Sequence, residues 1–233
     1  MKPSEAIILA GGQGTRLNDT VPGIPKTLAP VCGKPFLYYI IRYFISQGIQ
    51  RFIFALGKQH DIIETFLLRE FPALPKVILA EEEQLGTGGA IKNALGSSRE
   101  NTVAVINGDT LYKVNLGPMS AFHHMCGAEC TIALKPMKAF NRYGAVELNK
   151  DYSIASFLEK KYCEQGLING GVYLLNKRLF LLNDLPDRFS FEDDYLGKPF
   201  VDKRFYGVKQ DGYFIDIGTP EDFQRAQFEI LPE

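Results

Sequence analysis

The sequence predicts a mostly parallel α/β sheet flanked by helices, with antiparallel β insertions in the second half of the chain. Three observations support this fold class. Apolar runs alternate with helical patterns through the first half, a glycine-rich turn directly follows the first apolar run, and β-rich runs succeed one another in the second half. Alternating strands and helices are typical of βαβ units, which form parallel sheets. The predicted architecture is therefore Rossmann-like.

The first half of the chain alternates between predicted strands and predicted helices. Pro35 suits the start of the first helix, because proline is tolerated in a first turn, and Gly48 suits its end. Between them, Phe36, Ile40 and Phe44 recur at helical spacing. The predicted strands cover residues 6–10, 52–56, 77–80 and 103–106, and the predicted helices cover residues 35–48, 61–71 and 88–95.

The second half is rich in β-forming residues and ends in a helix. The runs "ECTIAL", "YGAVEL", "SIASFLE" and "GGVYLL" predict short strands with few helices between them, which favours antiparallel pairing. The segment "GYFIDIGTPEDFQRA" predicts a strand, a turn and a helix that Thr219 caps and Pro220 begins. No linker, repeat or low-complexity tract interrupts the chain, so the expected organisation is one domain over residues 1–233.

The composition is that of a globular protein with a full core. The 233 residues are 45% hydrophobic and 23% charged, and 26 Lys and Arg residues against 27 Asp and Glu residues give a formal net charge of -1. This balance does not favour nucleic-acid binding or attraction to an anionic membrane, so any anion site must be local. No apolar run approaches the roughly 18 residues that a membrane helix needs.

The cysteines of the chain do not form a C-x-x-C pair. His123, Cys126 and Cys130 are expected to share one helix, but their spacing matches no common zinc motif. We therefore interpret the cysteines as free thiols in a reducing compartment. The first residues lack the length of a signal-peptide core, which adds to the expectation of a cytoplasmic protein.

The stretch "ILAGGQGTRL", residues 8–17, places a glycine-rich turn directly after the first strand. A P-loop would need Gly-Lys followed by Ser or Thr, which none of the Gly-Lys pairs has, and a dinucleotide fingerprint would need a third glycine where Leu17 stands. Two interpretations remain: a backbone cradle for an anion, or an ordinary tight turn with Arg16 on the surface. The residues of the predicted cradle are Leu9, Ala10, Gly11, Gly12, Gly14, Thr15 and Arg16.

Lys26, in "GIPKTLAPV", favours the cradle. The segment around it is stiffened by Pro22, Pro25 and Pro30, so the lysine is expected to be held in place. Together with Arg16, it would put two cations beside an amide-lined turn, which suits a triphosphate.

Asp109 and Asp216 each stand at the end of an apolar strand, in "NGDT" and "YFID". Taken singly, each is equally well explained as a turn residue or a residue flanking a helix. Taken together in a phosphate-binding sheet, they suit Mg²⁺, which takes one or two carboxylates and fills its other positions with phosphate oxygens and water.

The motifs "LAGGQGTRL", "PKTLAPV" and "KPFLYYII" together resemble those of the sugar-1-phosphate nucleotidyltransferase (nucleotide-sugar pyrophosphorylase) family. The similarity continues through "LGTGGAI", "NGD", "RYGAVEL", "FLEKK", "INGGVYLL" and "FIDIGTPEDF", and so spans almost the whole chain. The resemblance implies a nucleotide-diphospho-sugar transferase fold. It also implies an enzyme that transfers a nucleotidyl group from an NTP to a sugar 1-phosphate, binding the nucleotide mainly with residues 1–115 and the sugar phosphate mainly with residues 116–233.

Within this family, "LGTGGAI", "LINGGVYLL", "FSFEDD" and "FIDIGTPEDF" most resemble bacterial D-glycero-D-manno-heptose 1-phosphate guanylyltransferases. This finer resemblance implies GTP as the nucleotide and a heptose 1-phosphate as its acceptor. Mannose-1-phosphate guanylyltransferases, and thymidylyl-, uridylyl- or cytidylyltransferases acting on other sugar 1-phosphates, remain alternatives. So does an inactive homologue that only binds nucleotide sugars, and the sequence leaves homo-oligomerisation open.

The implied reaction needs no side-chain nucleophile, because the sugar phosphate is already ionised and can attack the α-phosphorus in line. Catalysis then consists of positioning and charge neutralisation, for which the candidate residues are Arg16, Lys26, Asp109 and Asp216. Arg16 would hold the leaving pyrophosphate, and Lys26 would offset charge as the two anions approach. The resemblance assigns Mg²⁺ to Asp109 and Asp216.

The stretch "EEEQLGTGGAI" is expected to line the base pocket, since its glycines let the backbone approach a planar ring and its threonine can hydrogen-bond to it. The carboxylate of Glu81 can accept from both N1–H and the N2 amine of guanine. Three consecutive glutamates are otherwise typical of a solvated face. The remaining predicted nucleotide-binding residues are Gly86, Thr87, Gly88, Asn107 and Asp109.

For the sugar phosphate, the resemblance implies Gly144 in "RYG", Glu159 and Lys160 in "LEKK", and Asn169 and Gly170 in "INGG". Glu159 can accept from sugar hydroxyls and Lys160 can pair with the phosphate, although a surface ion pair would explain both residues equally simply. Many relatives continue this Glu-Lys pair with proline, whereas this chain continues with lysine, so the local backbone is expected to differ.

Overall fold

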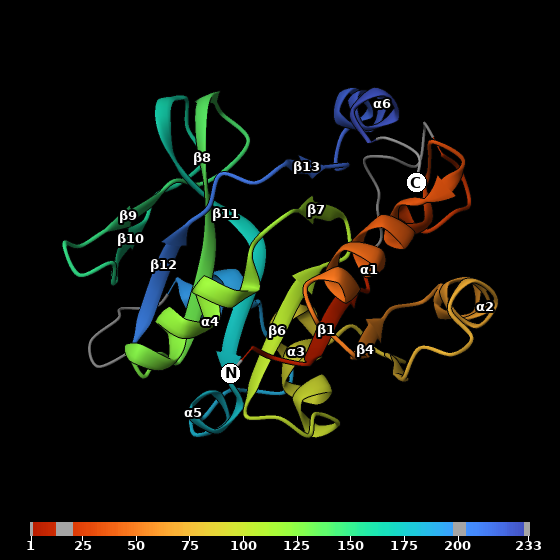
Figure 1. Ribbon diagram of the computed structural model, residues 1–233, viewed down its shortest axis with the longest axis horizontal. Helices are drawn as coiled ribbons and strands as arrows, with labels where there is room; N and C mark the ends of the chain where they lie inside the picture. The colour runs from red at the N-terminus through yellow and green to blue at the C-terminus, as the bar shows by residue number, and fades with distance from the viewer. Residues whose placement is uncertain (1, 13–20, 198–203, 231–233) are drawn as a thin grey trace.

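The computed structural model describes residues 2–12, 21–197 and 204–230. Its central sheet has seven strands in the order β12-β8-β11-β6-β1-β4-β5, and only β11 runs against the others (Figure 1). This confirms the predicted parallel sheet with antiparallel additions. The strands are β1 (Glu5–Ala10), β4 (Arg51–Leu56), β5 (Lys76–Ala80), β6 (Thr102–Asn107), β8 (Cys130–Phe140), β11 (Cys163–Asn176) and β12 (Phe205–Lys209).

Helices cover both faces of the sheet and close a hydrophobic core on each (Figure 1). One core receives side chains from α1 (Phe36–Ser46), α2 (His60–Glu70), α4 (Leu116–Met125) and α6 (Pro220–Glu229). The other receives them from α3 (Gly86–Gly96), α5 (Lys177–Leu181) and the short helical segment η2 (Phe191–Leu196). The strands between the cores are therefore buried on both sides, which explains their continuous apolar character.

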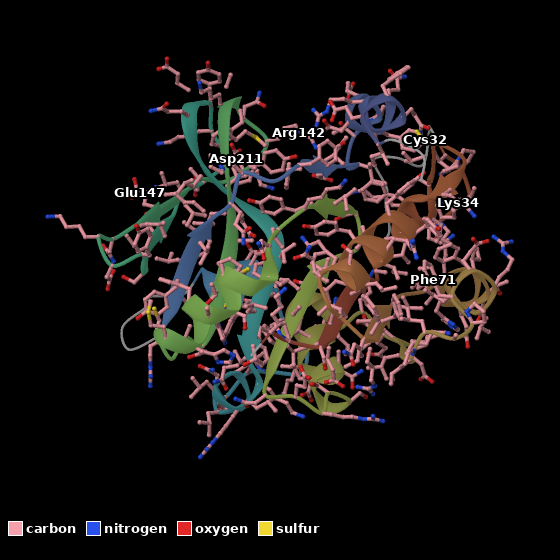
Figure 2. The ribbon with its side chains drawn as sticks, viewed as in Figure 1. Cys32, Lys34, Phe71, Arg142, Glu147 and Asp211 are labelled. Atoms are coloured by element: carbon pink, nitrogen blue, oxygen red, sulfur yellow. The ribbon has the colours of Figure 1, made fainter. Side chains whose placement is uncertain are left out.

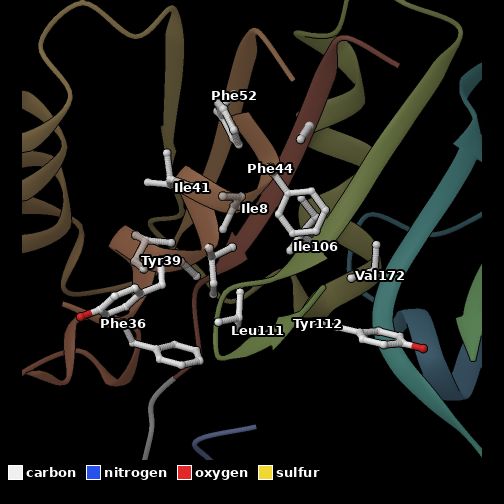
Figure 3. Close-up of a cluster of buried hydrophobic side chains, with 14 of the residues drawn as sticks. Ile8, Phe36, Tyr39, Ile41, Phe44, Phe52, Ile106, Leu111, Tyr112 and Val172 are labelled. Carbon is white, nitrogen blue, oxygen red and sulfur yellow. The ribbon is translucent and has the colours of Figure 1, made fainter. Parts of the chain in front are cut away.

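Side-chain alternation along each strand divides the apolar residues between the two cores. Ile8 of β1 and Phe52 of β4 pack with Phe44 of α1, as Figure 3 shows, whereas Ile7 and Ile53 pack in the opposite core. Successive residues of a strand point to opposite faces, so a shift of one residue in register would exchange the two sets.

Within residues 2–12, 21–197 and 204–230, three small two-stranded sheets accompany the central sheet. Their strands are β2 (Pro30–Val31) with β3 (Lys34–Pro35), β7 (Thr110–Tyr112) with β13 (Phe214–Asp216), and β9 (Val146–Leu148) with β10 (Ile154–Phe157). The antiparallel pairing of β7 with β13 joins the segment after β6 to the segment before α6. It thereby links two parts of the chain that are far apart in sequence.

The predicted strands and helices of the first half all occur, with ends within two residues of those expected. The hydroxyl of Thr219 accepts a hydrogen bond from the Asp222 amide at 3.2 Å, and Pro220 is the first residue of α6, so the predicted cap is confirmed. None of the helices in the described part of the chain combines the length and apolar character needed to span a bilayer.

The expectation that His123, Cys126 and Cys130 share a helix is wrong. Helix α4 ends at Met125, and Gly127 then adopts a φ of +54°, a left-handed conformation that turns the chain out of the helix. Cys130 consequently begins β8.

Candidate active site

A cleft of about 610 Å³ opens at the carboxyl ends of β1, β4 and β6, the edge at which open α/β sheets bind ligands. The residues around it come from the turn after β1, from β4 and β11, from η1 (Lys26–Leu28), from the start of α3 and the segment before it, and from the segments beside β7, β13 and η2. They are Leu9, Ala10, Gly11, Gly12, Lys26, Thr27, Ala55, Glu81, Gln84, Gly86, Thr87, Ala90, Asn107, Asp109, Tyr173, Arg188, Phe191, Glu192, Asp216 and Gly218.

The end of β1 and the turn after it pack closely against two neighbouring turns, which have glycines at the points of contact. A Cβ on Gly57 would lie 2.5 Å from the carbonyl oxygen of Gly11, and one on Gly108 would lie 2.7 Å from that of Leu9. No atom of the described residues lies within 4 Å of the place where a Cβ of Gly12 would stand. The predicted cradle residues Gly14, Thr15 and Arg16 lie outside the described residues.

Lys26 stands at the start of η1, where the turn after Pro25 fixes it. The amide of Leu28 donates to the carbonyl of Pro25 at 2.7 Å, and the Lys26 side chain is only 15% exposed. Its Nζ atom lies 2.7 Å from Oδ2 of Asp109 and 3.7 Å from Oδ1 of Asp216. The lysine is therefore held in place, as the prolines around it predicted.

The two aspartates meet because β7 and β13 pair. Asp109 directly precedes β7, Asp216 ends β13 opposite Thr110, and the Ile217 amide donates to the carbonyl of Asp109 at 3.1 Å. The two carboxylates that the sequence places at the ends of separate strands thus face one lysine. Their convergence depends on backbone pairing as well as on the ion pairs.

The Asp216 carboxylate is under strong electrostatic influence. Burial, and then the nearby Asp109 carboxylate, raise its pKa. Lys26 and Arg142 oppose that rise, and the Gly218 amide donates to Oδ1 at 2.7 Å. A second cation at this position would relieve the repulsion between the two carboxylates.

Arg142 lies in the connection between β8 and β9 and reaches across to α6 (Figure 2). It forms an ion pair with Asp222 in the first turn of α6, and its Nη2 atom lies 3.6 Å from Oδ2 of Asp216. The Tyr143 hydroxyl lies 3.4 Å from the same Asp216 oxygen, and burial and Asp216 raise the pKa of this tyrosine to about 12. Arg142 and Tyr143 therefore orient Asp216 from the side opposite Lys26.

The donor set at this point suits Mg²⁺. Two half-buried carboxylates, Asp109 and Asp216, converge on the wall of a cleft with room for phosphate and water oxygens. All the side-chain donors are hard oxygens, which magnesium prefers, and two carboxylates match its usual protein contribution.

Glu81 differs from the two glutamates that follow it. Its side chain is half-buried and lines the cleft, whereas Glu82 and Glu83 are exposed. Burial raises the Glu81 pKa, and the Leu85 amide donates to Oε2 at 3.2 Å. The solvated-face interpretation therefore applies to Glu82 and Glu83, and Glu81 remains a candidate to contact a base.

Gly88, at the start of α3, lacks a side chain for a reason other than access for a base. A Cβ on Gly88 would lie 2.1 Å from the Phe189 ring, and Gly88 is buried and does not line the cleft. Its missing side chain makes room for Phe189, so the idea that Gly88 gives a base access is not supported by its surroundings. Gly86 and Thr87 do line the cleft, and the Thr87 hydroxyl accepts from the Phe191 amide at 2.9 Å.

The residues expected to hold the sugar phosphate lie beside the cleft and are not part of its described lining. The backbone of Gly144 packs against the carbonyl of Leu158. Glu159 and Lys160, which follow Leu158 in the chain, are exposed. A Cβ on Gly170 would lie 2.3 Å from Tyr112, so this glycine is required by packing.

Asn169 is engaged within its own strand. Its Oδ1 accepts from the Gly171 amide at 3.0 Å and its Nδ2 donates to the Tyr173 hydroxyl at 2.8 Å, at an irregularity in the pairing of β11 with β8. In this arrangement Asn169 shapes the strand and positions Tyr173, which itself lines the cleft.

Several residues around the site were not singled out from the sequence. They are Thr27, Gln84, Arg142, Tyr143, Tyr173, Arg188, Glu192 and Gly218. The Oγ1 atom of Thr27 is buried without a hydrogen-bond partner among the described residues, although the side chain lines the cleft. Because a buried hydroxyl is expected to be paired, Thr27 is a candidate to contact a ligand.

The chain resembles known proteins along nearly its whole length. The sequence profile of the family described as "Nucleotidyl transferase" matches residues 5–233. The D-glycero-alpha-D-manno-heptose 1-phosphate guanylyltransferase of Aneurinibacillus thermoaerophilus is 47% identical over 226 residues, covering 97% of this chain and 98% of that relative. The protein of the same name from Campylobacter jejuni is 40% identical over 219 residues, covering 94% and 96%. The crystal structure of HddC from Yersinia pseudotuberculosis complexed with GMP-PN has a TM-score of 0.84 and 36% identity, covering 97% of this chain and 98% of that chain.

Proposed function

Because the chain belongs to the nucleotidyl transferase family, we propose that it transfers the guanylyl group of GTP to a D-glycero-D-manno-heptose 1-phosphate and releases pyrophosphate. The observation that carries this proposal is the convergence of Lys26, Asp109 and Asp216 at the carboxyl edge of the sheet. The guanylyltransferase names of the two bacterial relatives and the GMP-PN complex of HddC support the choice of nucleotide and acceptor.

The described side chains account for the chemistry without a protein nucleophile. The acceptor phosphate attacks the α-phosphorus in line, so the protein has to align two anions and offset their repulsion. Lys26 supplies positive charge between the reacting phosphates and Arg142 keeps Asp216 oriented. Mg²⁺, when held by Asp109 and Asp216, supplies further neutralisation of the triphosphate. Arg16 remains the candidate for holding the leaving pyrophosphate.

The two halves of the chain divide the substrates between them in this proposal. Residues 1–115 contribute the turn after β1, Lys26 and Glu81, and so take the nucleotide. Glu81 would accept from N1–H and the N2 amine of guanine, which are the donors that distinguish guanine from adenine at that edge. Residues 116–233 would take the sugar phosphate.

The test is a matrix of the four NTPs against several sugar 1-phosphates, with pyrophosphate release measured in the presence and absence of Mg²⁺. We expect the highest kcat/KM for GTP with heptose 1-phosphate, and loss of activity when a chelator removes the metal. Higher kcat/KM with mannose 1-phosphate would favour the mannose alternative, and preference for TTP, UTP or CTP would contradict the guanine assignment. Nucleotide-sugar binding without any pyrophosphate release would favour the inactive homologue.

A further inference from the structure

Glu192 is the one member of an acidic triplet that lines the cleft. The triplet Glu192–Asp193–Asp194 follows Ser190, which caps η2. Asp193 accepts from the Ser190 hydroxyl at 2.8 Å, and Asp194 accepts from the Ser190 amide at 2.8 Å. These two aspartates are therefore used in capping, whereas Glu192 extends to the cleft.

A hydrogen-bonded chain behind the cleft approaches the Glu192 carboxylate. The Tyr173 hydroxyl lies 3.4 Å from its Oε1 atom, and Asn169 donates to that hydroxyl at 2.8 Å. Tyr173 itself is fixed by an edge-to-face contact with Phe191, whose ring centroid is 5.0 Å away. The carboxylate is thus positioned by packed residues of β11 and η2.

Glu192 lies on the side of the cleft that the proposed function gives to the acceptor, because Tyr173 connects it to Asn169, a predicted sugar-phosphate residue. Protein around the cleft raises its pKa by desolvation, and the nearby Asp193 and Asp109 raise it further, whereas Lys160 lowers it. Asp109 is a proposed ligand of the Mg²⁺ that would bind the triphosphate. Lys160 belongs to the segment expected to bind the sugar phosphate.

The carboxylate retains most of its hydrogen-bonding capacity. An ionised carboxylate can accept about four hydrogen bonds, and Tyr173 is the one donor to Glu192 among the residues that the structure describes. A carboxylate cannot attract phosphate, so its natural partners at this end of the cleft are hydroxyl groups. Two adjacent hydroxyls can occupy its two oxygens together.

We propose that Glu192 binds hydroxyl groups of the acceptor sugar and thereby selects the sugar, a role that rests on the proposed nucleotidyl transfer. Asn169 then acts through Tyr173 as a positioning residue. Of the predicted contacts in "LEKK", Lys160 would hold the phosphate of the acceptor, while Glu159 and Glu192 would both hold hydroxyl groups of its ring.

The test compares Glu192→Gln with Asp193→Asn, a matched loss of one charge on the same segment. Glutamine keeps the size of the side chain but replaces one acceptor oxygen by a donor. We expect Glu192→Gln to raise the KM for the sugar 1-phosphate about ten- to hundredfold, the range for a hydrogen bond to a charged group, while the KM for GTP changes less than about twofold. Asp193→Asn should leave both KM values unchanged.

Monodeoxy derivatives of the acceptor identify the contact. Wild-type enzyme should discriminate against the derivative that lacks the bound hydroxyl, and Glu192→Gln should lose that discrimination. Tyr173→Phe leaves the carboxylate in place and should raise only the sugar KM, by a smaller factor. This variant tests the same chain of contacts if Glu192→Gln fails to fold.

Three results would overturn the inference. Unchanged sugar KM in Glu192→Gln, an increase confined to GTP, or undiminished discrimination among the deoxy derivatives each excludes contact with the acceptor. All three require a wild-type enzyme that releases pyrophosphate with GTP and a sugar 1-phosphate. Wild-type protein that is inactive with every acceptor would instead overturn the proposed function and this inference with it, so the two failures are distinguishable.

Discussion

The Nζ atom of Lys26 lies 2.7 Å from Oδ2 of Asp109, and the same Nζ faces the Asp216 carboxylate at 3.7 Å. One ammonium group therefore offsets the repulsion between two carboxylates that backbone pairing brings together. In the proposed reaction, the same charges would be redistributed when the nucleotide and Mg²⁺ enter the cleft. Substitution of Lys26 or Asp109 should therefore reduce the reaction rate much more than the stability of the fold.

Asp109→Ala removes one of the two proposed metal ligands. We expect kcat to fall about a hundred- to a thousandfold, equivalent to roughly 3–4 kcal/mol of transition-state stabilisation, while the protein stays folded. Pyrophosphate release measures the rate and circular dichroism checks the fold. Asp211→Asn, which changes an exposed carboxylate paired with Lys135, is the control and should retain full activity. A folded Asp109→Ala variant with near-normal turnover would show that the metal assignment is wrong.

Lys26→Ala tests charge neutralisation separately from metal binding. The expected loss in kcat is again about a hundred- to a thousandfold, because the proposed mechanism places this charge beside the reacting phosphates. The Mg²⁺ concentration that gives half-maximal activity should change less than in Asp109→Ala. Lys34→Ala, at an exposed lysine paired with Glu70, serves as the control. Equal turnover in Lys26→Ala and wild type would remove this lysine from the mechanism.

The parts of the site that could be predicted from the sequence are those set by local pattern. The turn after β1 and the two aspartates each directly follow an apolar strand, and the carboxyl ends of parallel strands share one edge of a sheet. Lys26 was predictable because prolines around it restrict the backbone. The sheet followed from the same apolar runs, since strands buried on both faces carry few polar residues.

The rest of the site depends on long-range packing, which sequence pattern does not specify. Glu192 looks like an ordinary acidic residue in a helical first turn, and only its approach to Tyr173 places it at the cleft. Gly88 looks like a residue that makes room for a ligand, yet it makes room for Phe189. Arg142 gains its role through ion pairs with residues more than seventy positions away, Asp216 and Asp222.

Glu81→Gln should weaken GTP binding. Glutamine presents one acceptor in place of two, and a hydrogen bond to a charged group contributes about 1.5–3 kcal/mol, so the expected loss of affinity is about ten- to hundredfold. Thermal shifts with each NTP and Mg²⁺ measure it. Glu83→Gln removes an exposed charge from the same run and should bind GTP normally. Unaltered GTP affinity in Glu81→Gln would return Glu81 to the solvated-face interpretation.

Thr27→Val replaces a buried hydroxyl by a methyl group of similar size. The hydroxyl has no hydrogen-bond partner among the described residues, so its removal should leave thermal stability unchanged or higher. The kcat/KM for GTP should fall about three- to tenfold, because a neutral hydrogen bond to the ligand is lost. Thr27→Ser keeps the hydroxyl and should restore kcat/KM. Loss of stability without loss of kcat/KM would instead assign the hydroxyl a structural partner.

His123 should make the protein less stable in mild acid. Its side chain is 1% exposed, with Nδ1 2.8 Å from the Thr131 hydroxyl. Burial, and then the proximity of His124, lower its pKa from 6.5 to about 4. Between these two values the unfolded chain binds a proton that the folded chain does not, so the free energy of unfolding falls as the pH decreases through that range. The contribution of His123 to the free energy of unfolding is fully present above pH 6.5 and is lost progressively toward pH 4.

Urea denaturation at neutral pH and at about pH 5 measures the effect, for which the pKa difference gives a loss of about 2 kcal/mol. His123→Asn keeps a polar group near Thr131 but cannot bind the proton, so its free energy of unfolding should vary much less between the two conditions. His124→Asn, an exposed neighbour on α4, should retain most of the wild-type dependence because the buried imidazole is still present. If His123→Asn and wild type lost the same stability in acid, the titrating group would have to be sought among the carboxylates, whose protonation destabilises folded proteins in the same direction.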